Sequence, residues 1–560
     1  MLALLALASV LLAATGTPPV VRLVDVAEQA GLTLRNLCGE ATKDYIVEVN
    51  GNGAAFFDHD NDGDMDVLIV NGSTLRTIER GGDPIAALYE NDGKGRFRDV
   101  TERSGLDKRG WGMGVCAADY DNDGFQDLYV TAHGPNTLFR NNGDGTFADV
   151  TAKAGVGDPR WSTGCAFGDY DRDGDLDLYV ANYLTFDVKK VPRRGASPSC
   201  KFMGIDVMCG PRGLPGEPDA LYQNNGDGTF RDVTEAAGIR DPGYYGFGVV
   251  FTDVDDDGWP DIYVANDSVP NFLFRNNRNG TFSEIGLVAG VALSEAGKEQ
   301  AGMGVDAGDY NNDGRFDLFV TNFSHDSNTL YRNDGQAFFS DVTFPAGLGE
   351  SSLPYLGWGT AFVDLDNDGL RDIFVANGHV YPEIDAHALG TKYLQRKLVY
   401  RNLGDGRFRE ASEEIGGDVL LERSSRGAAV GDYDNDGDPD VLVVNLNDRP
   451  SLLRNDGGNG NHWLTFRLVG TRSNRDAVGA RLVLTVAGRT HHAEVRSGGS
   501  YLSHNDMRVH FGLGQATAAA RLEIRWPSGL VEKFQDLGAD QFLLVKEGEG
   551  LRPLQAGGRN

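Results

Sequence analysis

One short acidic stretch occurs seven times in this chain and constrains the fold more than any other feature. The first copy reads DHDNDGDMD from Asp58, and the others begin at Asp119, Asp169, Asp253, Asp309, Asp364 and Asp432. Position 6 is always Gly, and positions 1, 3, 5 and 9 carry Asp or Asn. Those four positions are Asp58, Asp60, Asp62 and Asp66; Asp119, Asp121, Asp123 and Asp127; Asp169, Asp171, Asp173 and Asp177; Asp253, Asp255, Asp257 and Asp261; Asp309, Asn311, Asp313 and Asp317; Asp364, Asp366, Asp368 and Asp372; and Asp432, Asp434, Asp436 and Asp440.

This spacing suits a calcium loop. Ca²⁺ takes six to eight oxygen ligands, and short carboxylates at alternate positions of a tight turn can point to one centre. Gly at position 6 allows the chain to wrap around the ion. Position 7 would contribute only its backbone carbonyl, so its side chain is free to vary, as it does in Asp64, Phe125, Asp175, Trp259, Arg315, Leu370 and Asp438. The sequence predicts about seven Ca²⁺ sites and no other cofactor.

The residues after each loop exclude an EF-hand. An EF-hand requires Glu at position 12 and a following helix. Position 12 is Ile or Val in every copy, and the segments that leave the loops, such as DLYVT and DIFVA, are β-branched and aromatic. They predict strands. A solvated Asp/Asn/Gly turn without an ion remains the alternative for each copy.

The formal charge of −30 restricts the partners of the chain. Phosphate binding requires a basic face, so nucleic acid is not expected as a partner. Much of the acidity lies in the loops, where clustered carboxylates repel one another unless a cation is present.

The N-terminus indicates export. Residues 1–16 begin with the apolar run MLALLALASVLLAAT and predict a cleaved signal peptide; an uncleaved membrane anchor is the alternative. We find no other stretch suited to a transmembrane helix. We therefore expect the protein to be secreted or extracytoplasmic, in the periplasm or at the cell surface.

The chain has five cysteines. Cys200 and Cys209 share one Pro/Gly-rich insertion and are the expected disulfide. Cys116 and Cys165 lie in apolar runs and are expected to be buried hydrophobic residues. The pairing of Cys38, Cys116 and Cys165 is open.

A unit of four strands recurs with the loops. In residues 110–156 we expect one strand before the loop, one after it, and a hairpin whose turn is NNGDGTF. Four-stranded units repeated four to eight times form β-propellers. The sequence predicts an all-β, seven-bladed propeller over residues 20–457. The last unit lacks a fourth strand, and the segment from Leu23 is expected to supply it and close the ring.

Two insertions interrupt the repeats, at residues 183–219 and 378–397. Long insertions on a rigid scaffold commonly carry ligand contacts. Decorative loops are an equally good interpretation of both.

After Asn461 the repeat gives way to alternating strands. These predict a small β domain at residues 461–548 and a disordered tail at 549–560. His491, His492, His504 and His510 could suggest a metal or acid–base site, but surface histidines are the favoured interpretation because neighbouring residues of a strand face opposite ways.

Two motif sets resemble a known family. The loops with flanks such as GFGVVFTD from Gly246 resemble the FG-GAP/VCBS repeats of integrin α-subunit propellers. GARLVLTV from Gly479, GGSYLSHNDMRVHFGLG from Gly498 and WPSG from Trp526 resemble the ASPIC/UnbV domain. The combination is similar to the cartilage-acidic-protein family. This resemblance implies a seven-bladed propeller with calcium in the loops and an extracellular interaction or adhesion role.

Three functions are compatible with these features. The first is a secreted, calcium-stabilised binding or adhesion module for an unidentified extracellular protein or glycan. The second is a hydrolase or lyase with a site in the central funnel, although no catalytic motif marks one. The third is a structural surface component. Neither catalytic residues nor the oligomeric state follow from the sequence.

Overall fold

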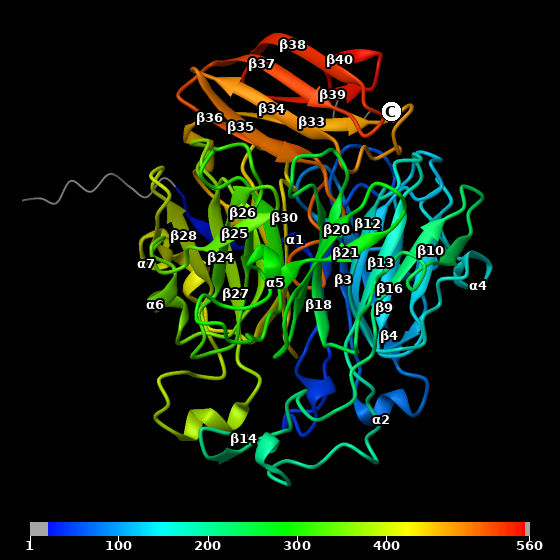
Figure 1. Cartoon of the computed structure of the whole chain (residues 1–560), viewed down its shortest axis with the longest axis vertical. Coiled ribbons are helices and arrows are strands. Elements are labelled where there is room, and N and C mark those ends of the chain that lie inside the picture. The colour runs from blue at the N-terminus through cyan, green and yellow to red at the C-terminus, as the bar shows by residue number, and fades with distance from the viewer. Residues whose placement is uncertain (1–20, 555–560) are drawn as a thin grey trace, which may run out of the picture.

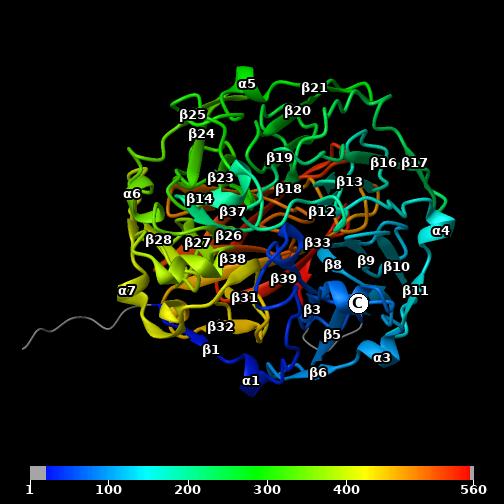
Figure 2. The same cartoon turned by 90° about the horizontal axis from the view of Figure 1, so that it is seen from below.

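The structure, a computed structural model, describes residues 21–554. The predicted signal peptide at 1–16 and the end of the predicted tail lie outside the described residues. Seven four-stranded antiparallel sheets form a ring, and two further four-stranded sheets form a domain on one face of it (Figure 1, Figure 2). The predicted all-β, seven-bladed propeller with a C-terminal β domain is confirmed.

Each sheet of the ring is one blade, and its strands follow one another from the centre to the rim. Blade 1 contains β2 (Ala54–Phe57), β3 (Asp66–Val70), β5 (Ala86–Asn91) and β6 (Phe97–Asp99); blade 2, β8 (Gly112–Ala118), β9 (Asp127–Ala132), β10 (Thr137–Asn141) and β11 (Phe147–Asp149); blade 3, β12 (Ser162–Gly168), β13 (Asp177–Asn182), β16 (Ala220–Asn224) and β17 (Phe230–Asp232); and blade 4, β18 (Gly246–Thr252), β19 (Asp261–Asn266), β20 (Phe272–Asn276) and β21 (Phe282–Glu284). Blade 5 contains β22 (Val305–Gly308), β23 (Asp317–Val320), β24 (Thr329–Gly335) and β25 (Phe338–Asp341); blade 6, β26 (Gly357–Val363), β27 (Asp372–Asn377), β28 (Leu398–Asn402) and β29 (Phe408–Glu410); and blade 7, β30 (Ser425–Gly431), β31 (Asp440–Asn445), β32 (Ser451–Asn455) and β1 (Leu23–Asp25).

Single-turn helices and two-residue strands lie in the connections between the blade strands. The α-helices of the described chain are single turns: α1 (Ala27–Ala30), α2 (Leu75–Ile78), α3 (Thr101–Ser104), α4 (Thr151–Ala154), α5 (Gly286–Ala289), α6 (Gly349–Ser352) and α7 (Ser412–Ile415). Two-residue strands pair as β4 (Asp83–Pro84) with β7 (Arg109–Gly110), and as β14 (Lys201–Phe202) with β15 (Ile205–Asp206). Within residues 21–554, every helix is too short to cross a membrane.

The second strand of each blade is buried on both faces. In β9, Leu128 and Val130 pack in the cluster between blades 1 and 2, whereas Tyr129 packs in the cluster that blade 3 shares. Alternate side chains of a strand point to opposite faces, so an apolar strand between two blades contributes to both contacts.

The N-terminal strand closes the ring. Strand β1 pairs antiparallel with β32, with Leu23 opposite Asn455 and Asp25 opposite Leu453. The predicted closure is confirmed. Blade 7 therefore combines the two ends of the propeller segment, and β1 covers the outer edge of β32.

The C-terminal domain packs two sheets face to face. One contains β36 (Val509–Gly514), β33 (His462–Val469), β39 (Gln541–Lys546) and β40 (Gly550–Pro553), and the other contains β35 (Arg489–Glu494), β34 (Arg481–Val486), β37 (Ala518–Arg525) and β38 (Val531–Gly538). The prediction of disorder from residue 549 is wrong for Gly550–Pro553, because β40 pairs with β39. The tail alternates too little for sequence patterning to reveal an edge strand.

A segment of the C-terminal domain enters the centre of the propeller. We call residues 497–505 the plug. Its Ser500 and Leu502 carbonyls accept hydrogen bonds from the inner strands of blades 5 and 2, and His504 bonds with blade 1. The Tyr501 hydroxyl donates to the Asn50 carbonyl at 3.0 Å. The central funnel that the enzyme hypothesis requires is therefore filled on the side that faces the C-terminal domain.

The expectation of surface histidines is wrong. His504 is fully buried in the plug. His510 bonds Thr465 at 2.8 Å and Asn367 at 2.6 Å, so it lies between the domain and blade 6. Burial lowers the pKa of His504 and His510 to about 3, so both rings are neutral at pH 7. The strand pattern did not reveal that a sheet face is covered by the propeller.

Candidate metal centres

Each acidic loop is closed by its first carboxylate. In the second loop, Asp119 accepts the N–H of Asp123 at 2.9 Å and that of Gly124 at 2.6 Å. Gly124 has φ of +100° and Asn122 has φ of +58°, so the turn passes through the left-handed region twice. The same pair of bonds occurs in all seven loops.

Backbone N–H groups also fix the carboxylates at positions 5 and 9. The Asp123 carboxylate accepts the N–H of Phe125 at 3.1 Å. One oxygen of Asp127 accepts the N–H of Asn141 at 2.7 Å, and the other accepts the N–H of Tyr120 at 3.2 Å. These bonds hold acidic side chains in place before any cation is considered.

Position 3 behaves differently. One carboxylate oxygen of this residue is buried and has no hydrogen-bond partner among the described residues in six of the loops: Asp60, Asp121, Asp171, Asp255, Asp366 and Asp434. In the remaining loop Asn311 occupies the position and exchanges hydrogen bonds with Asp313. A buried carboxylate oxygen without a donor is unfavourable, and a cation in the loop would remove that cost.

The carboxylates lie close enough to share one ion. Oxygens of Asp119, Asp121 and Asp127 all lie within 4.8 Å of one another, and the same holds for equivalent groups in other loops, including Asp169, Asp171 and Asp177, and Asp253, Asp255 and Asp261. The loops thus supply a preorganised cluster of hard oxygen donors. This donor set fits Ca²⁺.

The electrostatics of the loops agree with this fit. Burial, followed by the carboxylates of Asp173 and Asp171, raises the pKa of Asp169 to about 7. Burial, followed by Asp368 and Asp366, raises that of Asp364 to about 8. Protein groups alone therefore do not compensate the negative charge of these loops. In the loop that contains Asn311, burial raises the pKa of Asp309 only to about 6.

Side chains from the third strand meet the loop from outside. Arg140 donates to Asp121 and to Asp123, each at 2.5 Å, and Gln223 donates to Asp171 at 2.5 Å. Arg401 pairs with Asp366. These donors meet one oxygen of the position-3 carboxylate and leave the other facing the loop.

The proposed contribution of a backbone carbonyl at position 7 of each loop stays a prediction. Its N–H donates to the position-5 carboxylate, as at Leu370 and Asp368 at 2.8 Å. The side chain of Arg315 pairs with Asp313 at 2.5 Å, and Trp259 lies under Arg172, whose guanidinium is 5.4 Å from the ring. The side chains at position 7 thus make different contacts in different loops.

Sequence reasoning missed the residue that joins neighbouring loops. The asparagine at the end of each third strand was interpreted as a turn residue. The Nδ2 of Asn141 donates to the carbonyls of His59 at 2.7 Å and Gln126 at 3.1 Å, so it bonds the loops of blades 1 and 2 at once. The equivalent residues are Asn91, Asn224, Asn276, Asn333, Asn402 and Asn455. The repetition of Asn before each turn was the available sequence signal.

His59 was also missed. It stands at position 2 of the first loop, where the other loops have Tyr, Val or Leu. Its Nδ1 lies 2.6 Å from Asp66, and the two residues group with Asp60. Burial lowers the pKa of His59, but the hydrogen bond and charge of Asp66 raise it overall. The first loop therefore differs from the others in having an imidazole nitrogen beside its carboxylates.

The C-terminal domain covers the loop face. Arg467 donates to Asp58 at 3.0 Å and to Asn61 at 2.6 Å, and Arg508 donates to Asn435 at 2.7 Å. Asp476 accepts the N–H of Asp119 at 2.7 Å. The domain therefore contacts several loops and restricts access to that face.

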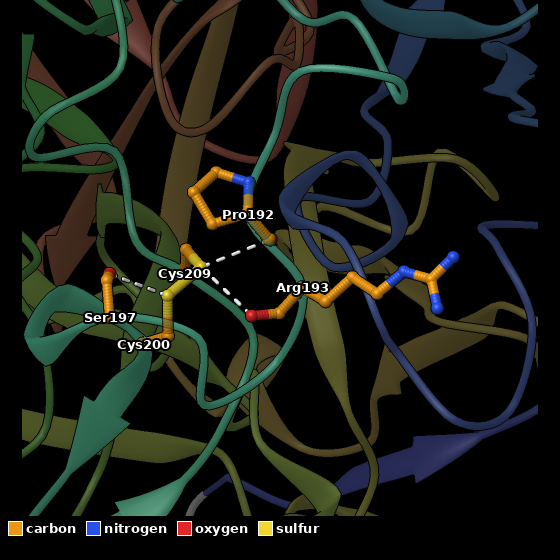
Figure 3. Close-up of a disulfide and its surroundings, with 5 residues drawn as sticks. All are labelled: Pro192, Arg193, Ser197, Cys200 and Cys209. Carbon is orange, nitrogen blue, oxygen red and sulfur yellow. Dashed lines mark hydrogen bonds between the residues drawn. A yellow bond between two sulfur atoms is a disulfide. The ribbon is translucent and has the colours of Figure 1, made fainter.

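The two insertions lie on the opposite face (Figure 1). Cys200 and Cys209 form a disulfide there, and the Cys209 sulfur lies 3.3 Å from the Pro192 carbonyl (Figure 3). The described chain leaves Cys38, Cys116 and Cys165 as buried free thiols.

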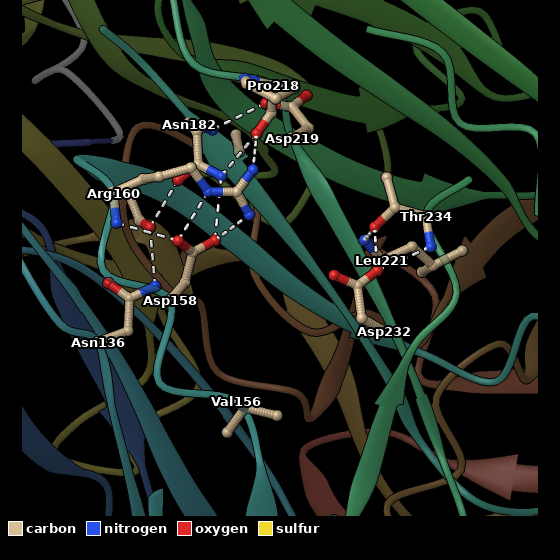
Figure 4. A network of polar contacts seen from close by, with 12 residues as sticks. Asn136, Val156, Asp158, Arg160, Asn182, Pro218, Asp219, Leu221, Asp232 and Thr234 are labelled. Atoms are coloured by element: carbon tan, nitrogen blue, oxygen red, sulfur yellow. Dashed lines mark hydrogen bonds and ion pairs between the residues drawn. The ribbon is translucent and has the colours of Figure 1, made fainter. Parts of the chain in front are cut away.

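A polar network anchors both ends of the first insertion (Figure 4). Asn182, at its start, donates to the Pro218 carbonyl at 2.9 Å and to Asp158 at 3.2 Å. Arg160 pairs with Asp158 and also donates to Pro218 at 2.5 Å. The insertion therefore leaves and re-enters blade 3 at a fixed point.

Two family models match the chain. The FG-GAP-like repeat model matches residues 58–130, 119–180, 205–264, 253–320, 309–375 and 390–443, and the ASPIC and UnbV model matches residues 470–552. Four of the FG-GAP-like matches begin at a position-1 carboxylate, at Asp58, Asp119, Asp253 and Asp309.

The chain is also similar to curated relatives and to solved structures. Cartilage acidic protein 1 of Mus musculus is 30% identical over 320 residues, which cover 56% of this chain and 46% of that protein. The Homo sapiens protein is 30% identical over 321 residues, which cover 56% and 45%. The chain thus spans about half the length of the curated relatives it matches. An Agrocybe aegerita lectin that recognises non-reducing terminal N-acetylglucosamine aligns with a TM-score of 0.38 and 17% identity, over 69% of this chain and 85% of that one.

Proposed function

We propose that this chain, which belongs to the FG-GAP-like repeat family and has an ASPIC and UnbV domain at residues 470–552, is an exported, calcium-binding β-propeller. The protein acts as an extracellular binding and adhesion module. Its partner is an extracellular protein or glycan.

The buried, unpartnered oxygen at position 3 carries the calcium proposal. It recurs in six loops of the described chain, and each loop also holds backbone-anchored carboxylates at positions 1, 5 and 9. The side chains at positions 1, 3, 5 and 9 and the carbonyl at position 7 would hold the ion. Bound Ca²⁺ would supply the positive charge that these carboxylates lack.

Calcium suits the donor set better than magnesium. Ca²⁺ accepts many protein oxygens in flexible geometry, whereas Mg²⁺ requires a near-ideal octahedron and retains water. Extracellular sites of this kind fill at the high calcium concentration outside cells. Export and calcium binding therefore support each other.

The placement of the surfaces supports a binding role away from the loops. The C-terminal domain covers the loop face through Arg467, Arg508 and Asp476. The insertions extend from the other face, which makes that face the proposed ligand surface.

Isothermal titration of the mature chain tests the metal proposal. We expect up to about seven Ca²⁺ per chain, with Mg²⁺ binding much more weakly at the same concentrations. A Ca²⁺ titration without heat at several temperatures, together with no retained Ca²⁺ after equilibrium dialysis, would contradict it.

A further inference from the structure

We propose that a cavity between the two insertions binds a neutral saccharide. The inference rests on the proposed binding role and names the class of ligand. The cavity, which we call the insertion cavity, has a volume of about 410 Å³. Phe202 and Met208 from the first insertion, Tyr381 from the second, and Asn50 and Trp358 from the centre of the ring contribute to its wall.

The cavity is a cup with a closed inner end. The plug residue Tyr501 packs edge-on against Trp358, with ring centroids 4.8 Å apart. Its hydroxyl donates to the carbonyl of Asn50, which also lines the cavity. A ligand would therefore enter from the face that carries the insertions. The volume of the cavity suits one or two sugar rings.

Aromatic rings form much of the wall. Phe202 lies 5.9 Å from Phe323 and 5.4 Å from Tyr381, measured between ring centroids. Phe202 and Phe323 are only partly buried, so their rings are available to a ligand. The C–H face of a sugar ring is apolar and packs on such rings, while its hydroxyls remain free to hydrogen-bond at the edges.

A buried donor points to a ligand with acceptor oxygens. The Asn50 side chain is 2% exposed, and its Nδ2 has no hydrogen-bond partner within residues 21–554. A buried amide donor without an acceptor is unfavourable. Asp267 supplies the opposite kind of group, and its carboxylate already accepts the hydroxyls of Tyr183 at 2.7 Å and Ser268 at 2.8 Å. A donor and an acceptor that line the same cavity match hydroxyl groups, which can both donate and accept hydrogen bonds.

The charges around the cavity favour a neutral ligand. At the rim, Arg212 pairs with Glu299 at 3.1 Å, and Lys298 pairs with Asp326 at 3.4 Å. Each of these cations is matched by an anion, so the rim offers no excess positive charge to a phosphate or a carboxylate. The remaining carboxylate of the lining, Asp267, already accepts two hydroxyls, and burial raises its pKa, which makes it a weak partner for an ammonium group.

The disulfide positions the first insertion over the cavity. Cys200 immediately precedes β14, which contains Phe202, and Cys209 immediately follows Met208. The network around Asn182 and Arg160 fixes the roots of the same insertion (Figure 4). The aromatic wall is thus held by a covalent bond at one end and buried polar contacts at the other.

Saturation-transfer NMR on the calcium-loaded full chain tests this inference. The probes are methyl glucoside, methyl galactoside, methyl mannoside and N-acetylglucosamine, with inorganic phosphate and lysine methyl ester as charged probes. We expect at least one neutral sugar to bind and both charged probes to fail. Phe202→Ser should weaken binding about five- to tenfold, because it removes one stacking ring. Met203→Ser is the matched control, because Met203 is the neighbouring residue and is 60% exposed; it should leave binding unchanged.

Two further measurements distinguish failure of the saccharide inference from failure of the proposed calcium-binding function. The double variant Cys200→Ser, Cys209→Ser should weaken sugar binding while Ca²⁺ binding by calorimetry stays unchanged, since the loops lie on the other face. Normal Ca²⁺ binding without binding of any neutral sugar would overturn this inference and leave the proposed function intact. Absence of Ca²⁺ binding would overturn the proposed function instead. Equal loss of sugar binding in Phe202→Ser and Met203→Ser would also overturn the inference.

Discussion

At the scale of single residues, the loops depend on how each carboxylate oxygen is satisfied. Backbone N–H groups hold positions 1, 5 and 9, as at Asp169 and Asp173. The inner oxygen of position 3 receives no such bond in six of the described loops. The pattern of Asp residues predicted which side chains gather, but only the structure separates the anchored oxygens from the free one.

Asp171→Asn should weaken a single calcium site. The change retains an oxygen and removes one negative charge, and calcium affinity depends on the charge of the ligands. We expect about a tenfold loss at one site in calorimetry, with the remaining sites unchanged. The control is Asp227→Asn, because Asp227 lies in the neighbouring hairpin turn and its side chain accepts hydrogen bonds from Thr229, outside the acidic loop. Loss of all sites together would contradict the model of separate loops.

Glu547 makes a second residue-scale prediction. Its carboxylate accepts the N–H groups of Thr471, Arg472 and Ser473. Although burial raises the pKa of Glu547, these bonds and the Ser528 hydroxyl lower it to about 2. A carboxyl whose pKa is lowered on folding adds stability above its unfolded pKa, and that contribution disappears as the pH falls towards its folded pKa.

Glu547→Gln should therefore destabilise the protein by roughly 2 kcal/mol at pH 7, after allowance for solvent screening. The difference from the native chain should shrink between pH 4.5 and pH 2. Urea unfolding of both chains across this range measures it, with Glu549→Gln as control, since Glu549 pairs with Lys546 at the surface. A pH-independent difference would show that the charge of Glu547 is not responsible.

At the scale of elements, the strands and turns followed from local pattern. Apolar runs such as DLYV predicted the second strands, and Asn-Gly and Asp-Gly predicted the hairpins. Both kinds of element are predictable because they depend on residues that are close together in the sequence. The role of Asn141 did not follow, because its two acceptors lie 82 and 15 residues away. A hairpin turn accounts for Asn at this position equally well, so the sequence does not reveal the contact between blades 1 and 2.

Asn141→Ala should loosen the contact between blades 1 and 2. It leaves the buried carbonyl of His59 and the partly buried carbonyl of Gln126 without their donor, which costs about 2 kcal/mol. Thermal melting in calcium measures the loss. Asn142→Ala is the control, because Asn142 is exposed and its side chain bonds Thr146 within the same turn. Equal melting temperatures for the two variants would contradict the proposed link.

At the scale of the whole molecule, two long-range features fix the shape. The pairing of β1 with β32 closes the ring, and it was predictable because the last repeat lacked a strand. The plug was not predictable, because the segment around Tyr501 resembles an ordinary connection between strands. Its burial depends on a channel that exists only after seven blades have assembled.

Tyr501→Ala should therefore destabilise the propeller and the C-terminal domain together. Removing a fully buried aromatic side chain leaves a cavity and costs about 3–5 kcal/mol. We expect one lowered melting transition and faster cleavage between residues 455 and 462 by a non-specific protease such as proteinase K, because this segment contains no Lys or Arg. Phe344→Ala is the control, because Phe344 is 57% exposed. An unchanged transition for Tyr501→Ala would show that the plug does not couple the two parts.

We expect Ca²⁺ bound in the seven loops to stabilise the folded protein, because it neutralises their clustered carboxylates. Differential scanning calorimetry of the mature chain in millimolar Ca²⁺ and in excess chelator tests it most directly. Each occupied site adds stability to the folded state by mass action, so the calcium form should melt at least about 10 °C higher. Identical melting temperatures in calcium and in chelator would contradict the claim.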